Sequence, residues 1–123
     1  MYRVCKLSDI SDNSLNKFVI NTKEILVGMR NGKLFACDNS CPHRGASLHK
    51  GSYNENNLVC YLHGYEYDIC TGKLTKMRSW KQSETWIEQN PAWRESGDLI
   101  MYDVVVKSGQ VYLKMEPKVN TAP

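Results

Sequence analysis

The chain has 123 residues, of which 41% are hydrophobic, and its formal net charge at pH 7 is +3. This length predicts a single domain spanning 1–123, and so small a positive charge gives no reason to expect a nucleic-acid binder. No apolar run approaches the roughly 18 residues that a membrane span needs, and "MYRVCKLSDI" lacks the pattern of a secretory signal. We therefore expect a soluble protein of the cytoplasm, with no membrane partner.

Short stretches rich in Val, Ile, Leu and Tyr alternate with turn residues, which is typical of an all-β domain. The clearest hairpin lies at 24–37, where "EILVGMR" and "KLFAC" flank Asn31-Gly32, a dipeptide that supplies the positive φ angles of a tight turn. Two central strands flank His63-Gly64, and a C-terminal hairpin turns at Ser108-Gly109. The predicted strands are 24–30, 33–37, 58–62, 65–69, 99–107 and 110–115.

The alternation breaks over 76–97, a segment that carries all three tryptophans. It predicts a short helix over roughly 81–89, because Pro91 would stop any helix at that point. We expect the tryptophans in the core. The tail 116–123, "EPKVNTAP", is expected to be flexible.

Five cysteines in a chain without a secretory signal favour metal binding over a disulfide scaffold, because the number is odd and the expected compartment is reducing. Two of them stand close to histidines, in "CPHRGASL" (41–48) and in "CYLHGYEYD" (60–68). Cys5, Cys37 and Cys70 lie outside these stretches and are expected to be small buried hydrophobic residues. The third histidine, His49, is expected on the surface.

Three interpretations of the pattern C-x-H-x16-C-x2-H are open on chemistry alone. One zinc ion accepts two Cys and two His ligands tetrahedrally. A 2Fe-2S cluster takes two thiolates on one iron and two imidazoles on the other. In the third interpretation some of the four are ordinary buried residues. Spacing favours iron, because zinc fingers usually group like ligands, whereas each stretch here pairs one Cys with one His. Pro42, Gly45 and Gly64 allow the tight backbone turns that such loops need.

The two stretches resemble the cluster-binding boxes of the Rieske family, and the resemblance extends from "EILVGMRNGKLFAC" to "LIMYDVVVKSGQVYL". It implies the Rieske fold, an antiparallel β-sandwich with a small cluster-binding subdomain made by two loops. It also implies one 2Fe-2S cluster as cofactor. By this resemblance Cys41 and Cys60 would bind the inner iron, and His43 and His63 would bind the outer iron near the surface.

The sequence also departs from the family pattern. Quinol-oxidising members join an extra cysteine in each box as a disulfide, and the matching positions here are Ala46 and Leu62. Their serine donor to a bridging sulfide is replaced by Tyr65, whereas Tyr67 matches the family tyrosine that donates to a ligand sulfur. Because hydrogen bonds to cluster sulfur raise the potential, their loss predicts a low midpoint of about −150 to 0 mV. Tyr65 is open to three roles: core, shielding of the cluster or a partner surface. Pro91 is open to two, a lid over the cluster or a plain turn.

No motif for catalysis accompanies the boxes: the sequence has no Ser-His-Asp arrangement, phosphate loop or second iron site. Oxygenases of the family carry that second site in a large following domain, before which this chain ends. We therefore expect not an enzyme but a monomeric ferredoxin, carrying one electron from a reductase to an acceptor such as an oxygenase. The alternatives are a small Rieske subunit or regulatory component of a larger oxidoreductase, and a structural zinc module. The basic run Lys73, Lys76, Arg78 and Lys81 is interpreted as a solvated face, or else as a docking patch for an acidic partner.

Overall fold

The computed structural model describes residues 1–42, 45–61, 64–76, 78–82, 85–88 and 97–117, and of 78–82 and 85–88 it describes the backbone. Almost all regular structure in these ranges is β-strand, accompanied by two short 3-10 helices, η1 (Leu7–Asp9) and η2 (Leu48–Lys50). The strands are β1 (Tyr2–Lys6), β2 (Ser14–Ile20), β3 (Lys23–Arg30), β4 (Lys33–Asp38), β5 (Ser52–Asn54), β6 (Asn57–Val59), β7 (Glu66–Asp68), β8 (Leu74–Lys76), β9 (Arg78–Gln82), β10 (Thr85–Glu88), β11 (Met101–Lys107) and β12 (Gln110–Lys114).

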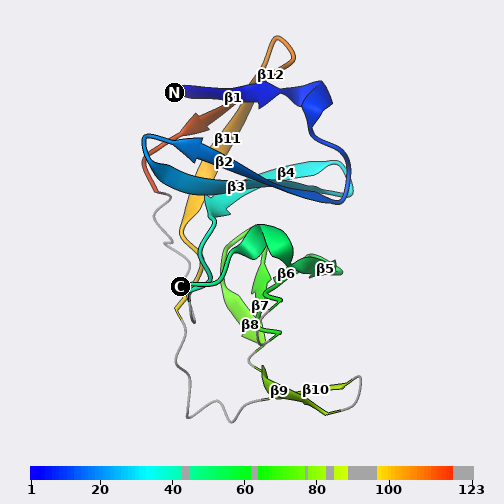
Figure 1. Cartoon of the computed structure of the whole chain (residues 1–123). Coiled ribbons are helices and arrows are strands. Elements are labelled where there is room, and N and C mark those ends of the chain that lie inside the picture. Colours follow the sequence, from blue (N-terminus) through cyan, green and yellow to red (C-terminus); the bar gives the residue numbers. More distant parts are fainter. Residues whose placement is uncertain (43–44, 62–63, 77, 83–84, 89–96, 118–123) are drawn as a thin grey trace.

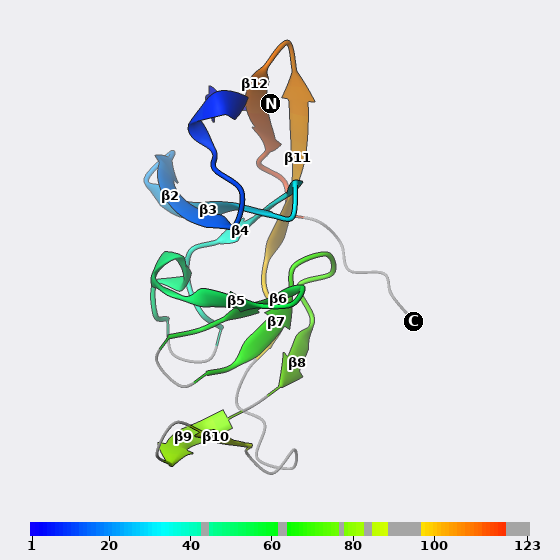
Figure 2. The ribbon, with the colours of Figure 1, turned by 90° about the vertical axis from the view of Figure 1, so that its right-hand side faces the viewer.

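The strands form three antiparallel sheets (Figure 1). The largest has six strands in the order β1-β12-β11-β4-β3-β2, the second has four in the order β5-β6-β7-β8, and β9 pairs with β10 alone. Figure 2 shows the four-stranded sheet between the six-stranded sheet and the β9–β10 hairpin. The all-β, antiparallel prediction is confirmed.

Both predicted hairpins are present. β3 pairs with β4 from Ile25↔Asp38 to Arg30↔Lys33, and Asn31 and Gly32 have φ angles of 51° and 79°. Two positive φ angles match the right-handed twist of the flanking strands, which explains why Asn-Gly appears here. β11 and β12 form the second hairpin, and β11 also pairs with β4, so the two hairpins share one sheet.

The described side chains form two cores, and the one that matters for function joins the large sheet to the four-stranded sheet. β3 and β4 contribute Leu26, Phe35 and Cys37, and the four-stranded unit contributes Leu58 and Tyr67. All five are at least 95% buried, so their apolar surface stabilises the joint. The second core lies within the six-stranded sheet.

The predicted helix over 81–89 is wrong for the described part of that range. Residues 78–82 and 85–88 are strands, which pair through Trp86↔Lys81 and Ile87↔Trp80. Tryptophan, threonine and isoleucine prefer strands, and this preference outweighs the helical spacing. Pro91, the chain on either side of it at 89–96, and the tail from 118 lie outside the described residues.

Besides β9 and β10, four further strands were not predicted from the sequence: β1, β2, β5 and β8. β1 and β2 are the edges of the six-stranded sheet, and β5 and β8 are three-residue edges of the four-stranded sheet. Edge strands bury fewer side chains, so their alternation of apolar and polar residues is weak. In the described ranges, no helix is both long and apolar enough to cross a membrane.

Candidate metal centre

Two loops carry the sequence-predicted cysteines, and each loop follows a strand. Cys41 lies three residues beyond the end of β4, on the segment that leads to η2. Cys60 comes directly after β6, in the connection from β6 to β7. β6 ends at Val59, so the predicted strand over 58–62 stops early and Cys60 belongs to the loop. Cys60 thus lies at the point where its ladder ends, and Cys41 lies within the loop that follows β4.

The two loops repeat the same backbone geometry. In the first, the N–H of Cys41 donates to the carbonyl of Ala46 (2.8 Å), and the N–H of Gly45 donates to the carbonyl of Cys41 (2.7 Å). In the second, the N–H of Cys60 donates to the carbonyl five residues later and the N–H of Gly64 to that of Cys60, both at 2.9 Å. The φ angles of Gly45 and Gly64 are 74° and 72°, a left-handed conformation that favours glycine. The loops therefore present their cysteines in equivalent ways.

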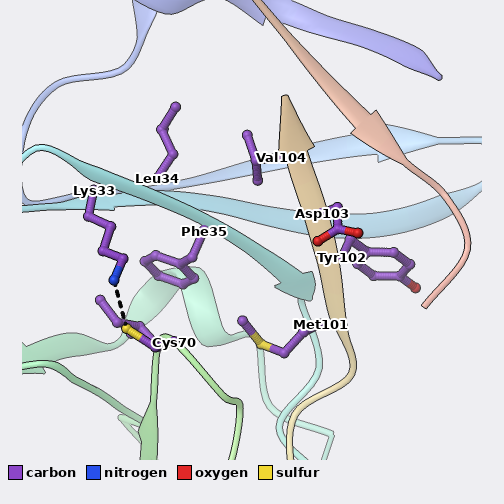
Figure 3. Close-up of a pocket in the computed structure, with 9 residues that line it drawn as sticks. Lys33, Leu34, Phe35, Cys70, Met101, Tyr102, Asp103 and Val104 are labelled. Atoms are coloured by element: carbon purple, nitrogen blue, oxygen red, sulfur yellow. Dashed lines mark hydrogen bonds between the residues drawn. The ribbon is translucent and has the colours of Figure 1, made fainter. Parts of the chain in front are cut away.

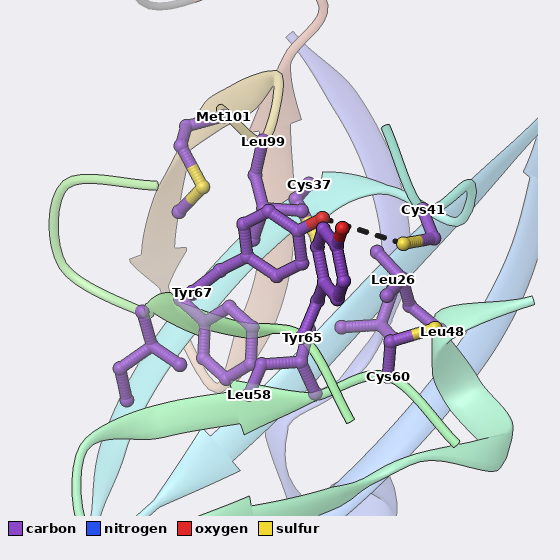
Figure 4. Close-up of a cluster of buried hydrophobic side chains, with 12 residues drawn as sticks. Leu26, Cys37, Cys41, Leu48, Leu58, Cys60, Tyr65, Tyr67, Leu99 and Met101 are labelled. Atoms are coloured by element: carbon purple, nitrogen blue, oxygen red, sulfur yellow. Dashed lines mark hydrogen bonds between the residues drawn. The ribbon is translucent and has the colours of Figure 1, made fainter. Parts of the chain in front are cut away.

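Both cysteine sulfurs lie in the core that joins the sheets (Figure 4). Cys41 is 2% exposed and Cys60 is 1% exposed, and both belong to the cluster formed with Leu48 and Leu58. Water is excluded from the sulfurs, so charge placed on them would be screened weakly. A thiol in such surroundings is inert unless a cation stabilises its thiolate.

Tyr67 and Tyr65 pack in the same buried cluster as the two cysteines. The Tyr67 hydroxyl lies 3.4 Å from Cys41 Sγ, which is the contact that the resemblance predicted. A metal-bound thiolate carries no proton, so the phenol would be the donor. Tyr65 is completely buried in the same core, which excludes the partner-surface role. Core packing and shielding of the site remain compatible with its position.

The histidines of the predicted ligand set, His43 and His63, lie outside the described residues, as does Leu62. Among the side chains that are described, no group of three or more His, Cys, Asp or Glu could hold a metal ion by itself. The described half of the donor set nevertheless fits a 2Fe-2S cluster, because two buried sulfurs on equivalent loops supply the soft ligands that iron–sulfur clusters take.

The remaining cysteines differ in their environment. Cys5 and Cys37 are buried as predicted, and burial raises the pKa of both thiols. Cys70 is exposed, so the prediction that it is buried is wrong. It lies in the turn after β7, and its sulfur is 3.2 Å from Lys33 Nζ (Figure 3). Both side chains line a cleft of about 310 Å³ on the β4 and β11 side of the molecule.

Sequence reasoning missed two polar groups near the loops. Asn39 is 4% exposed, and its Oδ1 accepts the backbone N–H of His49. His49 was predicted to lie on the surface, and it is half-buried. Glu66 is fully buried, and the amides of Asn54 and Asn57 donate to its carboxylate at 3.2 and 3.1 Å. The strand-end position of Asn39 and the alternation of Glu66 with two tyrosines were the available signals, and neither is specific.

The basic run is only partly described. Lys73 is half-buried and Lys76 is exposed. The side chains of Arg78 and Lys81 lie outside the described residues, so the docking patch stays a prediction.

A family model, the Rieske 2Fe-2S domain, matches residues 1–91. The chain belongs to the Rieske family. The family binds a 2Fe-2S cluster through two cysteines and two histidines, which agrees with the paired loops and their buried sulfurs.

Comparisons with known Rieske proteins give relatives of two lengths. The chain is 30% identical over 115 residues to the ferredoxin component of naphthalene 1,2-dioxygenase/salicylate 5-hydroxylase systems of Ralstonia sp., covering 89% of this chain and 90% of that protein. It is 34% identical over 76 residues to the oxygenase subunit of vanillate O-demethylase of Pseudomonas sp. (strain HR199 / DSM 7063), covering 62% of this chain. There it spans only 21% of the relative's length.

Solved structures agree on the fold. The ferredoxin of carbazole 1,9a-dioxygenase from Nocardioides aromaticivorans IC177 superposes with a TM-score of 0.70 at 23% identity, over 90% of this chain and 93% of that one. This likeness confirms the predicted Rieske fold.

Proposed function

We propose that the chain is a one-electron carrier in which Cys41, His43, Cys60 and His63 hold one 2Fe-2S cluster. The observation that carries the proposal is the pair of equivalent loops, each with a buried cysteine sulfur and a histidine two or three residues further on. The cysteines are the inner ligands, since their sulfurs lie in the core, and the histidines bind the outer iron. When bound, the cluster accepts and returns one electron.

The protein's own residues control the surroundings of that electron. Burial of Cys41 and Cys60 keeps water from the sulfurs, and with the cluster bound the Tyr67 hydroxyl, 3.4 Å from Cys41 Sγ, would donate to that thiolate. A donor at this sulfur stabilises negative charge on it, so it favours the reduced state. Gly64 and Gly45 hold the loops in their shared shape, and Tyr65 shields the site from solvent. Pro91 would contribute as a lid or as a turn.

The best-supported physiological role is that of a ferredoxin between a reductase and an oxygenase. The relative of nearly equal length from Ralstonia is such a component, and the alignment covers almost all of both chains. On this proposal residues 1–123 form one soluble, cytoplasmic domain that acts as a monomer. It has no catalytic site of its own, so its substrates are its redox partners.

A second candidate is a Rieske portion or small subunit of a larger oxidoreductase. The match to a longer oxygenase subunit, of which the aligned 76 residues are only 21%, favours it, because such subunits contain the same domain. The two candidates differ in whether the purified chain alone accepts electrons from a reductase and passes them to a separate oxygenase.

Metal analysis of the full chain, reconstituted anaerobically with iron and sulfide, tests the ligand assignment. We expect two irons and two sulfides per chain and a brown colour. Cys41→Ser and Cys60→Ser should each lose the colour. Cys37→Ser is the matched control, because Cys37 is equally buried in the same core, and it should keep the colour. A colourless chain holding one zinc would overturn the proposal and support the zinc module.

A further inference from the structure

The two cluster loops are closed at their bases in different ways. The second loop joins two neighbouring strands, so the β6–β7 ladder closes it through the pair Val59↔Glu66. The first loop leaves β4 in the six-stranded sheet and leads through η2 to β5 in the four-stranded sheet (Figure 1). No ladder can join its ends, since the flanking strands belong to different sheets. The Cys41 N–H bonds the Ala46 carbonyl inside the loop, but outside this pair no strand pairing like Val59↔Glu66 joins the two ends in the described part of the chain, so a different interaction has to do so.

Asn39 spans that base with its side chain. It follows β4 directly, and its Oδ1 accepts the backbone N–H of His49 at the far end of the loop (2.8 Å). Its Nδ2 donates to Glu24 Oε1 (3.2 Å) and lies 3.2 Å from His49 Nδ1. Its own backbone N–H donates to the Glu24 carbonyl (3.1 Å). These bonds join the two ends of the first loop, whose described residues are 40–42 and 45–48 and include Cys41.

The hydrogen bonds of Asn39 also fix the orientation of its side-chain amide and the tautomer of the His49 imidazole. Because Oδ1 accepts from a backbone N–H, the amide nitrogen faces Glu24 and the imidazole. Its two hydrogens then go to Glu24 Oε1 and to His49 Nδ1, which accepts only when the ring proton is on Nε2. All polar atoms of this 4%-exposed amide are satisfied, which makes it a specific link.

We propose that Asn39 is a positioning residue that closes the first cluster loop, doing with its amide what the β6–β7 ladder does for the second loop. The closure itself does not depend on the metal. Its effect on a cluster rests on the proposed function, so the test has one arm without metal and one with it.

Hydrogen–deuterium exchange of the metal-free full chain is the first arm. In Asn39→Ala the loop-one amides of Cys41 and Gly45 should exchange about tenfold faster, the change expected when one buried hydrogen bond is lost. The loop-two amides of Cys60 and Gly64 should exchange at the wild-type rate. Equal acceleration in both loops, or none in either, would overturn the proposal. This arm is independent of whether the chain binds a cluster.

Iron release from the reconstituted chain to EDTA is the second arm. Asn39→Ala should release iron about tenfold faster than wild type. The matched control is Asn16→Ala, which removes an amide that bonds Ser14 Oγ and the Val27 carbonyl within the large sheet; it should release iron at the wild-type rate. Equal acceleration by both substitutions would mean that Asn39 contributes only general stability.

Rescue separates positioning from packing. Asn39→Asp keeps the acceptor for the His49 N–H but turns a carboxylate oxygen toward Glu24, so it should release iron as fast as Asn39→Ala. Adding Glu24→Gln supplies an amide donor to that oxygen, and the double variant should return to near the wild-type rate. Failure of the second substitution to slow the release would contradict the hydrogen-bond assignment.

Discussion

The Tyr67 hydroxyl offers the sharpest test of how this fold controls an electron. Tyr67→Phe removes one oxygen that lies 3.4 Å from Cys41 Sγ and leaves the ring in a fully buried position. A hydrogen bond to a charged acceptor is worth about 1.5–3 kcal/mol, but most of this is common to both oxidation states. If about 1 kcal/mol of it is gained with the added electron, the midpoint falls by roughly 40 mV, since about 1.4 kcal/mol equals 59 mV for one electron.

Voltammetry of the reconstituted chain measures this shift. Tyr102→Phe is the matched control, because Tyr102 is 1% exposed and donates to Asp38 Oδ1 (2.6 Å) in the other core. Both variants should lose about 1 kcal/mol of stability to urea, whereas only Tyr67→Phe should lower the midpoint. An unchanged or raised midpoint in Tyr67→Phe, or an equal shift in the control, would refute the assignment of the phenol as a donor to the ligand sulfur.

Two further predictions concern the loops and the free thiols. Gly45→Ala and Gly32→Ala both force alanine to a positive φ angle without a steric clash, so each should cost about 1–2 kcal/mol of stability. Only Gly45→Ala should speed iron loss to EDTA, and equal iron loss from both variants would count against the role of the loop. Iodoacetamide should label the native, reconstituted chain at Cys70 alone, because Cys37 is buried and its raised pKa keeps it protonated; native labelling of Cys37, measured by mass spectrometry, would contradict this.

Local chemistry explains which parts of the fold could be predicted from the sequence. Asn31-Gly32 specifies a tight turn through backbone sterics alone, so the hairpin around it was predicted with nearly its observed bounds. The two cysteine–histidine pairs predict a metal site from ligand chemistry. The two loops that carry the cysteines have the same pattern of backbone hydrogen bonds, which agrees with that prediction.

Properties that depend on distant neighbours were not predictable in this way. Cys70 is exposed because its N–H and that of Thr71 donate to Asp68 Oδ1, a turn that directs it away from the core. His49 is half-buried because Asn39 from another element reaches it. The strands β9 and β10 replaced a helix because they pair with each other. Each outcome depends on tertiary contacts, about which composition and periodicity carry little information.

An anaerobic redox titration of the reconstituted full chain, followed by its visible spectrum, tests the central claim most directly. The account predicts a brown protein that takes up one electron with a midpoint of about −150 to 0 mV, the low part of the range for clusters with two histidine ligands. A midpoint well above roughly +100 mV would contradict the account of Ala46, Leu62 and Tyr65 as lost determinants of a high potential. A colourless protein that takes up no electron would contradict the cluster itself.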